Sequence, residues 1–181
     1  MHKHLRNAVI TLGGTLLSST VIAAPEQQAA AFMDIYASHC LKYLHDFDGL
    51  RKHLSASPQL PAEKAAMFLQ GAKGNAWVVP SKHGQFVLVV HQDKNLCALY
   101  AKTVPAEAAK ALFEKAVGKA PAPFRSERKR NSSDKGADGV KSTVAYEWST
   151  EESPRKPLFA LTVTTSKSSV AQGVATAAIG H

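Results

Sequence analysis

The chain has 181 residues, of which 45% are hydrophobic and 20% are charged, and its formal net charge is +8 at pH 7. This composition excludes an intrinsically disordered chain and a collagen-like repeat, and the length is sufficient for one domain with its own hydrophobic core. The excess of positive charge favours acidic partners, such as nucleic acid, anionic lipid or an acidic protein.

Residues 1–23 have the pattern of a secretory signal peptide. Basic residues come first, a mostly apolar stretch follows over 8–22, and the small residue Ala23 precedes the expected cleavage point. The alternative is an N-terminal membrane anchor, but this apolar stretch is shorter than the ~20 residues that span a bilayer. We therefore expect a periplasmic or secreted bacterial protein, cleaved before Ala24, with no membrane span after processing.

Cys40 and Cys97 are the only two cysteines of the chain. An even number of cysteines in an exported chain predicts an intramolecular disulfide, because disulfides form and persist in oxidising compartments. Two separate buried thiols are the alternative. A catalytic cysteine is less favoured, since a C-x-x-C redox motif is absent.

The hydrophobic pattern predicts several helices. Residues 25–44 place apolar side chains at spacings of three and four, and Cys40 lies on that apolar stripe. A short helical turn is expected at 50–54, and a second helix at 61–70 begins at a proline and ends before a glycine. The clearest helix spans 105–117, between another proline and glycine.

Between the second helix and the helix at 105–117, the hydrophobic period changes to two, which is typical of strands. Strands are expected at 76–79, 86–90 and 96–101, and the short turns between them favour antiparallel hairpins. Two further strands, at 143–148 and 159–163, show the same alternation of apolar and polar side chains.

The remaining segments have weaker patterns. Residues 119–139 are basic, contain Ser and Gly and have few large apolar side chains, which predicts a mobile loop. The Ala-rich tail, 168–181, predicts a weak helix. The order of elements predicts an α+β fold in a single domain over 24–181, in which one antiparallel sheet of about five strands carries helices on one face and one disulfide.

Motifs that carry chemistry are absent from the sequence. There is no glycine-rich phosphate loop, no G-x-S-x-G elbow and no H-E-x-x-H. His39 and His45 are six residues apart and fall on different helix faces, and Asp46 and Asp48 lack the further oxygens that calcium needs. We therefore predict no catalytic residue, no cofactor and no metal site.

A basic segment is the main candidate for a binding surface. Residues 119–130 contain five basic side chains and one acidic side chain. This segment is either a solvated loop or a contact site for an anionic polymer or an acidic protein. Specific nucleic-acid recognition is not expected, because only Phe124 could stack on bases. Because interfaces draw on Tyr, Trp and Arg, the candidate partner-binding residues are Arg125, Arg128, Lys129, Arg130, Tyr146, Trp148 and Arg155.

In residues 32–101, a helix that carries Cys40 is followed by the strand Trp77-Val78-Val79, by a strand from Phe86 to Val90, and by the run Cys97-Ala98-Leu99-Tyr100. This arrangement resembles a family of small secreted or lipid-anchored proteins of Gram-negative bacteria with no assigned activity. The resemblance implies a periplasmic setting and a bond between Cys40 and Cys97. It implies no catalytic residues.

Export, a single domain and the absence of a catalytic motif predict a non-enzymatic envelope protein. Its expected role is to bind another protein, as an inhibitor, an immunity-type protein or an adaptor. A binder of small ligands or anionic envelope polymers is the first alternative. A hydrolase whose carboxylates are dispersed along the sequence is the second.

Overall fold

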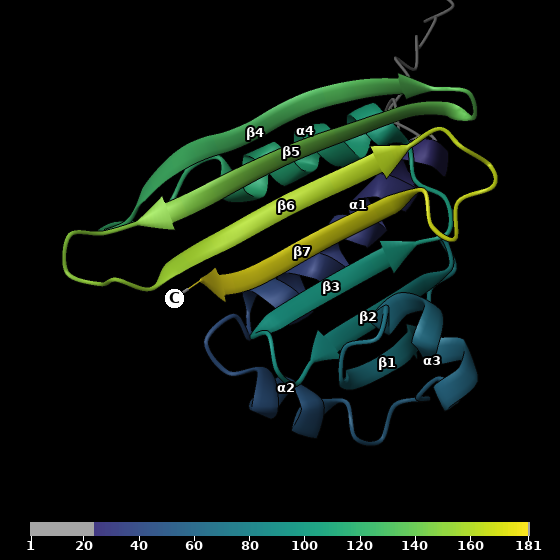
Figure 1. Ribbon diagram of the computed structural model, residues 1–181, viewed down its shortest axis with the longest axis horizontal. Coiled ribbons are helices and arrows are strands. Elements are labelled where there is room, and N and C mark those ends of the chain that lie inside the picture. Colours follow the sequence, from purple (N-terminus) through teal and green to yellow (C-terminus); the bar gives the residue numbers. More distant parts are fainter. Residues whose placement is uncertain (1–23, 181) are drawn as a thin grey trace, which may run out of the picture.

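The computed structural model describes residues 24–180, and the predicted signal peptide, residues 1–23, lies outside them. The described residues form one antiparallel sheet of seven strands in the order β1-β2-β3-β7-β6-β5-β4, together with five helices (Figure 1). The α+β fold is therefore confirmed. In chain order the elements are α1 (Ala24–Tyr36), the π-helix η1 (Ala37–Leu41), α2 (Phe47–His53), α3 (Ala62–Leu69), β1 (Gly74–Val79), β2 (Phe86–His91), β3 (Leu96–Ala101), α4 (Ala106–Val117), β4 (Arg125–Gly136), β5 (Gly139–Ser149), β6 (Lys156–Thr164) and β7 (Gly173–Gly180).

The sheet has seven strands, not about five, because two segments form strands that the sequence did not predict. The predicted loop over 119–139 is wrong, since β4 occupies most of it and pairs with β5 along its whole length. The predicted C-terminal helix over 168–181 is also wrong, since β7 pairs with β3 on one side and β6 on the other. Backbone pairing holds β4, whose side chains are mostly exposed, so a search for apolar side chains could not find it.

The other elements lie close to their predicted positions. The helix expected at 25–44 is α1, and it continues into η1 with a change of winding at Ala37. The helices expected at 61–70 and 105–117 are α3 and α4, and the helical turn expected at 50–54 is part of α2.

Two layers of helix lie on opposite faces of the sheet. On one face, which we call the helix-covered face, α1 and α4 pack side by side over the main core, where Phe32, Phe113 and Phe159 are fully buried (Figure 1). On the other face, α3 covers β1, β2 and β3, where Ala65 packs with Ala76. The expectation that all helices lie on one face is therefore corrected. β5, β6 and β7 have a helical layer on one face alone.

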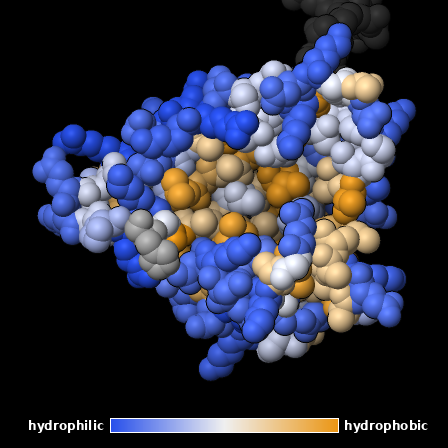
Figure 2. Space-filling view, viewed as in Figure 1, coloured by the Kyte–Doolittle hydropathy of each residue, from blue (hydrophilic) through white to orange (hydrophobic). Residues whose placement is uncertain are grey.

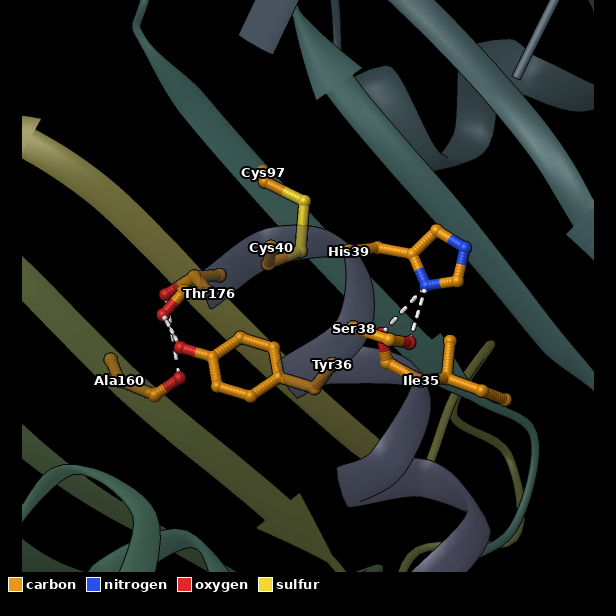
Figure 3. The surroundings of a disulfide bond; sticks show 8 residues. All are labelled: Ile35, Tyr36, Ser38, His39, Cys40, Cys97, Ala160 and Thr176. Carbon is orange, nitrogen blue, oxygen red and sulfur yellow. Dashed lines mark hydrogen bonds between the residues drawn. A yellow bond between two sulfur atoms is a disulfide. The ribbon is translucent and has the colours of Figure 1, made fainter. Parts of the chain in front are cut away.

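The disulfide between Cys40 and Cys97 is confirmed, and it joins η1 to β3 inside the core (Figure 3). Tyr36, the last residue of α1, is buried next to it and donates a hydrogen bond of 2.8 Å from its hydroxyl to the backbone oxygen of Thr176 in β7. Burial raises the pKa of Tyr36 well above its ordinary value, so its hydroxyl stays a proton donor. The helix end is thus tied covalently to β3 and by a hydrogen bond to β7.

The strand β7 joins the two parts of the sheet. It lies between β3, the last strand of the first antiparallel group, and β6, the last strand of the second (Figure 1). Its eight residues alternate between buried and half-buried, because every second residue faces the helix-covered core.

Candidate functional site

The uncovered half of the sheet is the most distinctive surface of the described residues. Because side chains alternate along a strand, the residues of β5, β6 and β7 that do not face the core point away from α1 and α4. The strand registers bring them into rows, such as Ala145 beside Ala160 and Ala160 beside Thr176. We call this surface the open face; it consists of Thr143, Ala145, Leu158, Ala160, Thr162, Val174, Thr176 and Ala178.

The open face has short side chains and is largely apolar, with three threonines among its three alanines, Leu158 and Val174. Figure 2 shows hydrophobic side chains gathered over β6 and β7, surrounded by hydrophilic ones. Most of its residues are half-buried by their strand neighbours, and Leu158 is 39% exposed. The hydroxyl of Thr176 donates to the backbone oxygen of Ala160, which satisfies its polar group within the sheet (Figure 3). Contiguous apolar surface with a polar rim is typical of interaction sites.

A pocket lies next to the open face, between α3 and the hairpin of β1 and β2. Its volume is about 430 Å³, and apolar side chains such as Phe68, Val87 and Tyr100 line it. Tyr100 and Val174 are cross-strand neighbours, so the pocket adjoins the open face at β3. The Tyr100 hydroxyl donates to the backbone oxygen of Phe68 at 3.2 Å, and burial raises the pKa of Tyr100. Pockets of ~300–1,000 Å³ with such linings hold small ligands or anchoring side chains.

Among the predicted partner-binding residues, Arg128, Tyr146 and Trp148 belong to the helix-covered face. The Tyr146 side chain is only 5% exposed, and its hydroxyl accepts a hydrogen bond of 2.9 Å from Arg128 Nε. The same guanidinium lies 3.4 Å from a carboxylate oxygen of Glu114 in α4. The hydrogen bond to Tyr146 raises the pKa of Arg128, and nearby Glu114 adds to this. Arg128 therefore links β4 to α4.

Trp148 has a similar structural position. Its indole Nε1 donates to the backbone oxygen of Val117 at 2.7 Å, and its ring packs against Phe159. This bond satisfies a carbonyl at the end of α4, where helices leave carbonyl groups without helical partners. The rings of Tyr146 and Trp148 thus hold α4 on the sheet.

Arg125, Lys129 and Arg130 lie on the other side of β4, next to the open face. Arg130 pairs with Ala145, and Lys129 contacts both Glu127 and Glu147, at 2.6 and 3.4 Å. The hydrogen bond to Glu127 raises the pKa of Lys129, so it stays positively charged.

The two remaining arginines lie near the loop that joins β5 to β6. Arg125 lies 3.7 Å from Glu151 in that loop. Arg155 lies within the loop itself, and its backbone hydrogen-bonds with the Ser153 hydroxyl. The structure therefore gathers Arg125, Lys129 and Arg130 beside the open face, and leaves Arg155 in the loop.

The titratable side chains include one local group, in which the Ser38 hydroxyl lies 2.9 Å from His39 Nδ1 and the ring centroids of His39 and His53 are 6.4 Å apart. Within residues 24–180, no group of three or more His, Cys, Asp or Glu side chains is placed to hold a metal ion. His91 is buried, and its pKa is lowered mainly by burial. The positive charge of Lys94 lowers this pKa further, and the negative charge of Asp93 raises it. None of the described helices is long and apolar enough to cross a membrane.

The sequence identified the basic side of this surface but missed the open face. Residues of β7 such as Val174 and Thr176 were assigned to a helix, so they could not be placed beside β6. A signal was present, because the β-branched Val174, Thr176 and Ile179 follow Gly173 in a segment without charges. Comparisons with protein-family models, with curated proteins and with solved structures find no match to this chain.

Proposed function

We propose that the protein is an exported, non-enzymatic binding protein of the bacterial envelope, and that its open face binds a protein partner. The observation that carries this proposal is the apolar surface that β5, β6 and β7 leave uncovered while their other face is packed with helices. An inhibitor, an immunity-type protein or an adaptor could each use such a surface to contact its partner. The signal pattern of residues 1–23 and the disulfide support export to an oxidising compartment.

The composition of the open face favours a protein over a small molecule. Short side chains such as Ala145, Ala160 and Ala178 let another backbone approach the sheet closely. The polar rim, which includes Glu147 and Lys129, supplies charged groups at the margin, as in protein interfaces with an apolar centre. The adjoining pocket lined by Phe68 and Tyr100 offers a place for one apolar anchor side chain of the partner.

The proposal predicts that Ala160→Lys abolishes partner binding. Ala160 lies in the middle of the open face and its side chain points away from the core, so a lysine there places a charge in the interface and leaves the core unchanged. The mature protein, residues 24–181, is used to capture binding proteins from an envelope extract. We expect a stoichiometric partner with the wild type, and a loss of at least about 100-fold in its affinity for the variant, since an unpaired charge in an interface costs several kcal/mol.

Ala111→Lys is the matched control, because Ala111 is exposed on α4, on the opposite side of the sheet. This variant makes the same chemical change and is expected to retain the partner. The proposal is rejected if both variants capture the same proteins as the wild type, or if no protein is captured in stoichiometric amount.

A further inference from the structure

The two edges of the sheet differ in whether another segment of the chain forms backbone hydrogen bonds with them. Along β1 the segment before α3 forms backbone hydrogen bonds, from Leu60 N to Ala76 O at 2.8 Å and from Val78 N to Pro58 O at 3.1 Å. Along the outer edge of β4 no strand or bridge pairs within residues 24–180. β4 is therefore the free edge of the sheet, visible along the top of Figure 1.

The free edge is long. β4 has twelve residues, contains no proline, and shows one irregularity in its pairing, between Arg128 and Arg130. An edge strand leaves a row of backbone N–H and C=O groups without partners, and such a row is a template for another strand. Of the common protections of an edge, β4 lacks short length and proline, and it has charged side chains and the one irregularity between Arg128 and Arg130.

Charge determines which strand this edge can accept. β4 carries a net charge of +3, from the five basic residues Arg125, Arg128, Lys129, Arg130 and Lys135 against the two acidic residues Glu127 and Asp134. Like charges on adjacent strands are destabilising, so a second copy of β4 or any basic strand is rejected. An acidic strand gains favourable cross-strand pairs, which makes the same charges a source of specificity.

We propose that the free edge of β4 binds an extended, acidic segment of a partner protein by strand addition. The backbone of the segment would pair with β4, and its Asp and Glu side chains would lie beside Arg125, Lys129 and Arg130. This inference goes beyond the proposed function, because it concerns the sheet edge and not the open face, and it assigns a chemistry to the segment that binds there.

The probe is a fluorescent peptide as long as β4 in which Glu alternates with Thr. We expect the mature protein to bind it, to lose affinity as salt is raised, and to show slower amide hydrogen exchange in residues 125–136 when the peptide is bound. Two altered peptides are compared with it. In one, Lys replaces Glu; in the other, alternate backbone nitrogens are methylated. Both should bind at least about tenfold more weakly, because the first reverses the charge pairs and the second removes backbone donors.

Two protein variants give matched tests of the surface. Changing Arg125, Lys129 and Arg130 together to Gln is expected to weaken the binding of the Glu-Thr peptide by about tenfold. Changing Lys64, Lys73 and Lys82 to Gln removes the same charge from exposed positions far along the sheet and should have little effect. Ala160→Lys should leave peptide binding intact, so failure at the edge and failure at the open face give different results.

Three results would overturn the proposal. The first is that the peptide does not bind. The second is that the methylated peptide binds as well as the unmodified one. The third is that the exchange of residues 125–136 is unchanged while the peptide is bound.

Discussion

At the scale of single residues, His91 is a buried histidine whose pKa is shifted in the folded protein. Its side chain is 7% exposed, and its Nδ1 has no hydrogen-bond partner in the described part of the chain. Burial lowers the pKa of His91 below its ordinary value of 6.5, with Lys94 lowering it further and Asp93 opposing. The folded protein therefore holds His91 neutral where the unfolded chain would already protonate it.

This difference predicts that the protein loses stability as pH falls through about 6.5, because the unfolded state then binds more protons than the folded state. Above about pH 6.5, His91 is neutral in both states and the protein keeps its full free energy of unfolding. As the pH falls, this free energy decreases until the pH lies below the lowered pKa of His91 in the folded state. His91→Leu removes this titration. Its free energy of unfolding in urea should vary less between pH 7 and pH 5 than that of the wild type. If the free energy of unfolding changes equally with pH in the wild type and in His91→Leu, His91 does not cause the pH dependence.

The basic residues of β4 show what the sequence could predict of the candidate site. The sequence correctly found that positive charge gathers in this segment. It could not separate Arg128, which contacts Tyr146 and Glu114 on the helix-covered face, from Arg130, which lies beside Ala145 on the other. The face of each residue depends on the strand register, and the irregularity between Arg128 and Arg130 changes the alternation at that point.

At the scale of elements, β7 shows where sequence reasoning failed for the fold. Alanine is common in helices, and the Val and Ala spacings of this segment fit a helical stripe as well as a strand. Tertiary packing decides for the strand, because β7 is paired on both sides and buries Ala175 and Ala177 against the core. The helices and strands with large apolar stripes, such as α4 and β2, were predicted correctly because their burial is encoded locally.

The start of β7 should tolerate no larger residue. A Cβ added at Gly173 would lie 2.4 Å from Cγ1 of Val104, a β-branched residue that cannot turn away. Gly173→Ala is expected to lower the free energy of unfolding by about 1–3 kcal/mol, as overpacking in cores does. Gly180→Ala, at the other end of β7, is the control, because the atom nearest to a Cβ added there would be 3.4 Å away. Equal urea midpoints for the two variants would contradict this packing.

At the scale of the whole molecule, the disulfide ties the N-terminal helical layer to the sheet. Cys40 and Cys97 are 57 positions apart, and both are fully buried. A cross-link of this span restricts the unfolded chain and stabilises the folded one by about 4 kcal/mol in the chain-entropy account.

Changing both cysteines to alanine should therefore lower the free energy of unfolding by about 2–4 kcal/mol, measured by urea denaturation under non-reducing conditions. Adding a reductant should destabilise the wild type towards the same value and leave the double variant unchanged. A reductant effect of equal size on both proteins would mean that the bond does not form.

The place of β7 in the sheet also sets the order in which the molecule can be completed. Six strands precede β7 in the chain, and they form two groups, β1 to β3 and β4 to β6. Within the sheet, only β7 joins these two groups. A chain that emerges from a ribosome or a membrane channel with its N-terminus first holds two unjoined halves until residues 173–180 arrive. Late arrival of the joining strand delays completion of the seven-stranded sheet until the last strand of the sequence has been made.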